Sequence, residues 1–139
     1  MDNNQSDSLE NPEWFSARET DTKPPLGRFH AVAGRNRNGL NWRVHFAISS
    51  FDLGMAGSAV INAWQVADIP SRSELKMTLL KGASRLEFRI EFAYDPPMDR
   101  VAGLDDDKNR AVATMNNLCS ELVKAGYSSV DSLENINSQ

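Results

Sequence analysis

The stretch RLEFRIEFAYD, residues 85–95, alternates apolar and polar side chains without interruption. A two-residue period is typical of a β-strand that buries one face and leaves the other in water. This strand therefore requires a sheet whose buried face is covered by another apolar element. The apolar positions of the stretch are Leu86, Phe88, Ile90, Phe92 and Tyr94.

The covering element is predicted at residues 104–125, where apolar side chains recur at helical spacing. Aspartates occupy positions 105–107 and Lys124 stands near the other end, so both ends suit the helix dipole. Gly126 follows as a residue that ends helices. The apolar stripe consists of Leu104, Ala111, Val112, Met115, Leu118, Cys119, Leu122 and Val123.

Two β-hairpins are predicted from alternation and turn residues. The first joins residues 28–33 to residues 41–50 through a turn that contains Asn38-Gly39, a strong hairpin signal. The second joins a strand with Leu75, Met77 and Leu79 on one face to residues 85–95, through a turn at residues 81–84.

Residues 58–68 fit two patterns. Their Val, Ile and Trp residues favour a strand, whereas the spacing of Val60, Trp64 and Asp68 also fits a helix. We interpret the segment as a strand and keep the helix as the alternative.

These elements predict an α+β fold, with an antiparallel sheet of four or five strands and a C-terminal α-helix packed on one face. Residues 27–139 form this single domain. Residues 1–26 are predicted to be a flexible acidic tail, because they are rich in Asp, Asn, Ser, Glu and Pro and have little apolar surface to bury.

Short elements are predicted at both ends of the chain. Asn11-Pro12 predicts the start of a short helix in the tail, and Ser128 or Ser129 caps a final helical turn. Trp14 and Phe15 form an aromatic anchor. We expect the anchor to dock the tail onto the domain, and the alternative is that it binds a partner.

The composition limits the classes of function. The chain has 139 residues, a formal charge of -4 and one cysteine, which excludes an intramolecular disulfide and favours a reducing cytoplasm. No apolar run is long enough to span a bilayer. Signature motifs of serine hydrolases, phosphate loops, dinucleotide-binding folds and zinc proteases are absent from the sequence.

The charge is unevenly distributed, because five basic residues and no acidic residue lie between Asp21 and Asp52. If the apolar residues of the first hairpin share one face, its basic residues and histidines share the other. Arginines there can bind carboxylates or phosphates in a bidentate manner. The predicted partner-binding residues are Arg28, His30, Arg35, Arg37, Arg43, His45, Trp14 and Phe15. The alternative is that the hairpin residues form ordinary cross-strand pairs with Glu87 and Glu91.

The pattern is typical of a small non-catalytic cytoplasmic interaction protein, such as a binder, an inhibitor, an immunity-type factor or a secretion-accessory factor. The basic hairpin would engage an acidic surface of another protein. The first alternative is a nucleic-acid-binding protein that uses the same hairpin. The second is an enzyme or small-ligand carrier with a pocket. A homodimer through an edge strand is a further possibility. The aromatic residues that can line the pocket of an enzyme or small-ligand carrier are Trp42, Trp64, Tyr94 and Tyr127.

No metal site or cofactor is predicted. His30 and His45 lack a cysteine or carboxylate at ligand spacing, and the three aspartates at 105–107 lack the alternating ligands of a calcium loop. Cys119 lies on the apolar stripe of the C-terminal helix, where a thiol is buried and unreactive.

Overall fold

The computed structural model describes residues 9–15, 25–36, 42–70, 72–80, 85–92 and 104–131. Within these ranges the chain alternates between strands and helices. The elements are β1 (Leu9–Trp14), β2 (Gly27–Asn36), β3 (Trp42–Ser50), α1 (Leu53–Val66), the 3-10 turn η2 (Arg72–Glu74), β4 (Leu75–Leu80), β5 (Leu86–Phe92), α2 (Leu104–Lys124) and β6 (Tyr127–Ser129).

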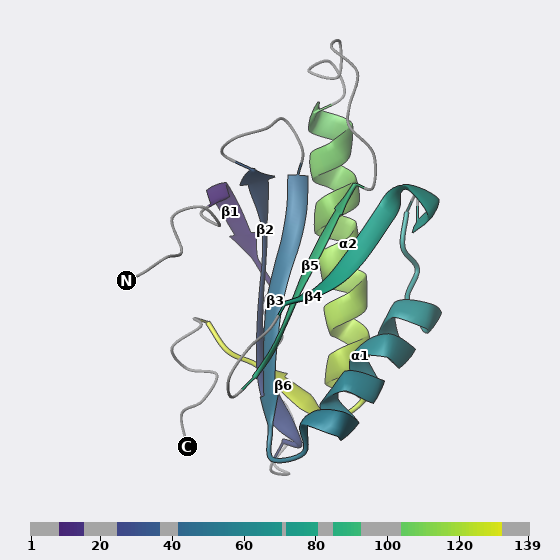
Figure 1. The fold of residues 1–139 in the computed structure, drawn as a ribbon. Helices are drawn as coiled ribbons and strands as arrows, with labels where there is room; N and C mark the ends of the chain where they lie inside the picture. Colours follow the sequence, from purple (N-terminus) through teal and green to yellow (C-terminus); the bar gives the residue numbers. More distant parts are fainter. Residues whose placement is uncertain are drawn as a thin grey trace.

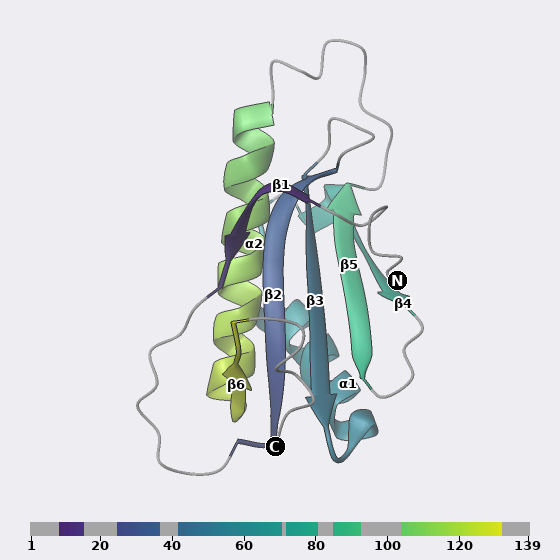
Figure 2. The ribbon, with the colours of Figure 1, turned by 90° about the vertical axis from the view of Figure 1, so that its left-hand side faces the viewer.

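The strands form one sheet in the order β1-β2-β3-β5-β4, and each neighbouring pair is antiparallel (Figure 1). The short strand β6 runs parallel to β2 along residues 27–29, and β1 pairs with the other half of β2. Figure 2 shows β1 and β6 along the same side of β2. The predicted antiparallel sheet with a C-terminal helix is confirmed, and α1 and β6 are additional.

The core lies between the sheet and the two helices. Phe46 of β3 and Phe88 of β5 stack with their ring centroids 5.0 Å apart at its centre. Alternate residues of β2, β3 and β5 point toward the helices, as the two-residue period requires. Buried helix residues that meet them are Ala56, Val60 and Ala63 of α1 and Ala111, Met115, Leu118, Cys119 and Leu122 of α2.

The register of the sheet matches both predicted hairpins. Phe29 pairs with Ile48 across β2 and β3, and Met77 pairs with Ile90 across β4 and β5. The turn predicted at residues 34–39 begins too early, because Gly34, Arg35 and Asn36 still belong to β2. Residues 37–41, the predicted turn at residues 81–84 and residues 93–95 lie outside the described residues.

The strand predicted at residues 58–68 is wrong, because most of this segment belongs to helix α1. Asp52 caps the helix by accepting a hydrogen bond from the backbone N–H of Met55 at 3.0 Å. Ala56, Val60 and Ala63 then follow at helical spacing and are all buried. Small residues at the first and third of these positions let the helix approach the sheet closely, which outweighs the β propensity of the valine, isoleucine and tryptophan.

The helix start predicted at Asn11-Pro12 is also wrong, because these residues belong to strand β1. The register of β1 against β2 shifts between Glu10 and Glu13, around Pro12. An irregular edge strand tolerates proline because one side of its backbone needs no ladder hydrogen bonds. Strand β1 therefore belongs to the same sheet as the rest of the chain, whereas residues 1–8 and 16–24 of the predicted tail lie outside the described residues.

The end of α2 differs from the prediction as well. Gly126 adopts a φ of 107° directly after the helix, which lets the chain turn back toward the sheet. Ser128 and Ser129 then lie in β6, so they cap no helical turn. The rest of the predicted final turn, residues 132–136, lies outside the described residues.

Candidate interaction surfaces

Two arginines and both histidines of the first hairpin lie on the outer sheet face, the face opposite the helices. Arg28, His30, Arg43 and His45 alternate along β2 and β3 with residues of the core. Strand β5 lies next to β3, and its own alternation brings Arg89 and two acidic side chains to the same face. The sheet order therefore places the basic hairpin beside Glu87 and Glu91.

The basic side chains on this face are largely covered and partly neutralised. His30 and Arg43 each expose only 5% of their surface. His30 Nδ1 lies 2.9 Å from the carbonyl oxygen of Val130. His45 Nε2 lies 3.3 Å from Oε1 of Glu87. The other carboxylate oxygen of Glu87, Oε2, accepts a hydrogen bond from Arg85 at 2.9 Å. Arg43 stands opposite Glu91 in the register. A surface of mixed and covered charges attracts an acidic partner weakly.

Arg35 is separated from the other basic residues of the hairpin. It pairs with Trp42 in the register, so it shares the side of β2 that carries Ala31 and Ala33. In the other direction it pairs with Glu10 of β1. Arg37 lies outside the described residues.

The two residues of the aromatic anchor differ in their surroundings. Phe15 packs against the core, with its ring centroid 6.0 Å from that of Phe29. Trp14 of β1 is more than half exposed and pairs with Val32 in the register. The register therefore places Trp14 on the outer sheet face, in one row with Val32 and His45, whereas Phe15 lies on the core side.

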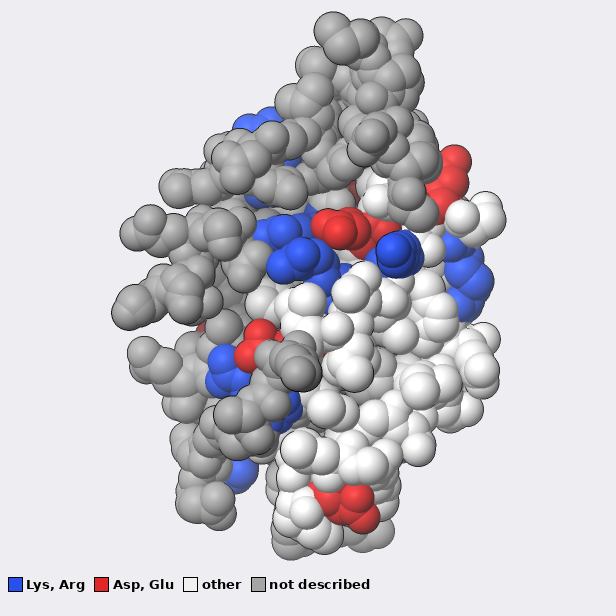
Figure 3. Space-filling model, viewed as in Figure 1, with Lys and Arg blue, Asp and Glu red and all other residues white. Residues whose placement is uncertain are grey.

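A second surface is formed by α1 and the residue pair before it, and we call it the α1 face. Large apolar side chains are exposed there, most of all Phe51, which exposes 89% of its surface. No residue between Leu53 and Ala67 is charged. Figure 3 shows an uncharged area where Figure 1 places α1, with charged side chains gathered above it and acidic atoms at its lower end. The α1 face consists of Phe51, Met55, Ile61 and Val66.

The sequence pattern missed this surface because residues 58–68 were interpreted as a strand. A usable signal was present. Asp52 is a good N-cap residue, and the two glycines and two alanines that follow it within seven positions fit a helix packed closely on a sheet.

A cluster of charges lies near the start of α2. Asp107 is buried and lies 2.6 Å from Arg110, which also lies 3.2 Å from Glu74. Lys108 lies 3.9 Å from Glu13 of β1 and 6.0 Å from the ring centroid of Trp42. These contacts join α2 to η2 and to β1, so the cluster holds the helix on the sheet.

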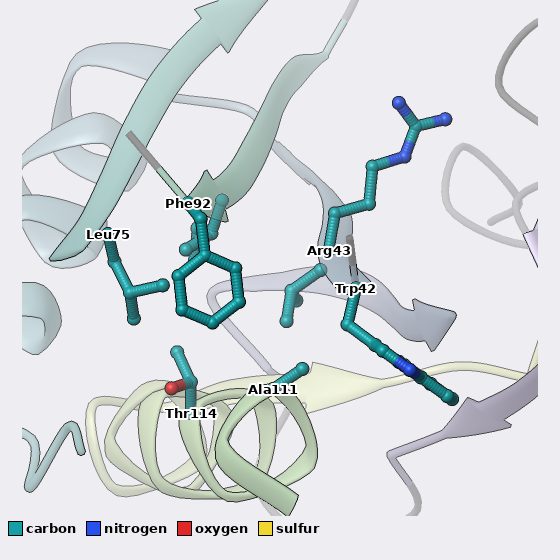
Figure 4. A pocket seen from close by; sticks show the side chains of 8 residues that line it. Trp42, Arg43, Leu75, Phe92, Ala111 and Thr114 are labelled. Carbon is teal, nitrogen blue, oxygen red and sulfur yellow. The ribbon is translucent and has the colours of Figure 1, made fainter. Parts of the chain in front are cut away.

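A small cavity lies between the sheet and α2, lined by Trp42, Leu75, Phe92 and Thr114 among others. Its volume of about 10 Å³ holds about one water molecule. The guanidinium of Arg43 points away from it (Figure 4). Ligand pockets measure on the order of 300 Å³ or more, so this cavity is no site for a metabolite.

The aromatic residues proposed to line a ligand pocket do not converge there. Trp42 borders the small cavity, and Tyr127 is buried in the core. Trp64 lies under the guanidinium of Arg72, 5.3 Å from its ring centroid. Tyr94 lies outside the described residues.

The remaining features concern chemical reactivity, metal binding and membrane insertion. Cys119 is buried in the core, and this burial raises the pKa of its thiol well above the ordinary range. Across the described ranges, no three His, Cys, Asp or Glu side chains come together in a way that could hold a metal ion. In the same part of the chain neither helix is long and apolar enough to cross a membrane.

Comparison of the chain with protein family models, with curated proteins and with solved structures finds no match. The surfaces are therefore interpreted from their own geometry.

Proposed function

We propose that this chain is a non-catalytic cytoplasmic interaction protein that binds an apolar, uncharged segment of another polypeptide on the α1 face. The observation that carries the proposal is the exposure of Phe51 just before α1 and of Met55, Ile61 and Val66 on this helix, which has no charged residue. Phe51 is nearly fully exposed, and Ile61 and Val66 are more than half exposed. Large exposed apolar side chains are costly in water, and where they gather they mark contact sites in soluble proteins.

The chemistry of the α1 face defines the partner. Its polar residues are Ser58, Asn62 and Gln65, all neutral and exposed. A face without cations has no attraction for phosphates, which argues against nucleic acid at this place. The acidic residue beside Phe51 is the capping residue Asp52, so the α1 face gains little from a charged protein surface. The matching partner is an apolar polypeptide segment, for example an amphipathic helix that lays its apolar side on α1.

The basic hairpin supports recognition less well. Its residues on the outer sheet face share that face with Glu87 and Glu91, and His30 and Arg43 are nearly buried. An acidic partner there would compete with Glu87, whose Oε1 lies 3.3 Å from Nε2 of His45. We therefore move the proposed contact site from the hairpin to the α1 face.

The test is capture of partners from an extract of the cells that produce the protein. The unchanged chain is compared with Ile61→Asp/Val66→Asp, which places two charges in the α1 face. The matched control is Asn116→Asp, which adds a charge at an exposed position of α2. We expect the bound protein to be retained by the unchanged chain and by the control, and to be lost from the α1-face variant.

Two further arms separate the alternatives. Charge reversal of Arg35 and Arg37 removes capture if the hairpin is the contact site, and nuclease treatment removes it if the bound material is held through nucleic acid. Capture that survives the two α1 aspartates but disappears with either of these treatments would refute the proposal. Thermal unfolding of each variant checks that it is folded.

A further inference from the structure

The two edges of the sheet differ in how well they are protected against pairing with another strand. One edge carries β1, whose register is irregular around Pro12 and which bears Glu10 and Glu13. The other edge is β4. It pairs with β5 through six consecutive residues without a register shift, and it contains no proline. Proteins usually protect edges with proline, bulges and charges, and β4 has only Lys76.

The outer side of β4 is available in the described part of the chain. Among the described strands, only β5 pairs with β4. Among the side chains of β4, Leu79 exposes 59% of its surface although it lies on the face that carries the core. An edge strand presents a row of backbone N–H and C=O groups away from the sheet, and these groups can bind a strand of another chain.

We propose that β4 pairs antiparallel with β4 of a second copy of this chain, so that the sheet continues from one copy into the other around a two-fold axis at Thr78. In this register Thr78 faces Thr78 of the second copy, and Met77 faces Leu79. Cross-strand threonine pairs and apolar pairs both stabilise antiparallel strands. In each copy, Met77 of the other copy thereby covers the exposed side chain of Leu79.

Charge disfavours the registers with an axis at Lys76 or Met77 and is compatible with the one proposed. An axis at Lys76 would place the two lysines directly opposite each other, about 5 Å apart, which is unfavourable. An axis at Met77 separates them by two positions, or about 7 Å along the strands. An axis at Thr78 separates them by four positions, or about 14 Å, which exceeds the Debye length of about 8 Å at physiological salt.

Because one edge of the sheet is protected, the assembly stops at two copies and does not grow into a longer row of copies. A sheet with two open edges can add copies at both and grow into a fibre. Here the edge formed by β1 and β6 is irregular, so pairing through β4 closes after two copies. The contact uses residues of β4, Leu75–Leu80, and none of the residues of the α1 face.

The experiment uses charges placed on the axis. Thr78→Lys and Thr78→Glu each bring like charges together at the centre of the contact, so each variant alone should sediment as a monomer while the unchanged chain sediments as a dimer. An equal mixture of the two variants brings Lys opposite Glu and should restore the dimer. The control Thr78→Val keeps the shape and the dimer.

A monomeric unchanged chain at high concentration would overturn the proposal, as would Thr78→Lys and Thr78→Glu variants that dimerise separately as well as they do together. Thr78→Cys gives a second measurement. We expect it to form a disulfide-linked dimer on mild oxidation, whereas Ser73→Cys, at an exposed position of η2, should remain a monomer on denaturing gels. Crosslinking of both variants to equal extents would contradict the register.

Discussion

The buried carboxylate of Asp107 lies 2.6 Å from the guanidinium of Arg110, three residues further along α2. The same guanidinium lies 3.2 Å from Glu74 and 5.3 Å from the ring centroid of Phe92. One arginine therefore joins α2 to the turn before β4 and to the end of β5. Since α2 covers the sheet, this contact helps to fix the helix over the decisive strand.

Asp107→Asn should lower the free energy of unfolding by about 3 kcal/mol, because it removes one partner of a buried ion pair and leaves the other. The value lies at the low end of the usual range because Arg110 is partly exposed and keeps Glu74. Urea unfolding measures the change. Lys124→Gln is the control, since Lys124 is exposed and its ion pair with Glu121 should contribute about 0.3 kcal/mol. Equal losses in both variants would show that the burial of Asp107 is unimportant.

Asp52→Ala should lower the free energy of unfolding by about 1 kcal/mol, because it removes the cap of α1. The Asp52 side chain accepts the backbone N–H of Met55, a donor that has no partner within the helix. Denaturant unfolding is again the measurement. Ser58→Ala, at an exposed position inside α1, should leave stability unchanged or raise it slightly, because alanine is the better helix former. A stability loss at Ser58 equal to that at Asp52 would argue against the cap.

The elements with an unbroken period could be predicted from the sequence. Strand β5 alternates at every position from Leu86 to Phe92, and α2 keeps its apolar stripe over most of its length. Strand β5 fits only the two-residue period of a strand, and α2 fits only the 3.6-residue period of a helix. Helix α1 could not be assigned in this way, because Ala56 and Ala63 are weak signals beside Ile61 and Trp64. There the packing of small residues against the sheet decides the structure.

The candidate surfaces were predicted less well than the fold. The face of the hairpin that carries Arg43 and His45 was predicted correctly from alternation. The proximity of Glu87 and Glu91 depends on β5 lying next to β3, and a strand order of this kind is not contained in the period of any single strand. The α1 face depends on a helix that the sequence pattern assigned as a strand.

Gly126→Ala should lower the free energy of unfolding by about 1–2 kcal/mol, because a φ of 107° is unfavourable for a residue with a Cβ atom. The added Cβ would also lie 3.1 Å from Cδ1 of Leu26. Gly54→Ala should have the opposite sign and raise stability by up to about 1 kcal/mol, because Gly54 lies inside α1 with space around it. Thermal unfolding of the two variants side by side tests this. Two changes of the same sign would contradict the backbone explanation.

Burial in the core raises the pKa of the Cys119 thiol, so the thiol stays protonated in the folded chain at pH values where it ionises in the unfolded chain. Stability from this group is fully present below the unfolded pKa of about 8.5 and is lost as the pH rises above it. Between pH 7 and pH 10 the unchanged chain should lose about 2 kcal/mol more than Cys119→Ala, which has no thiol to ionise. Urea unfolding of both at the two pH values measures the difference, and a thiol reagent should modify Cys119 only after unfolding. Identical pH dependence in the two chains, or rapid modification of the folded protein, would show that the thiol is accessible to water.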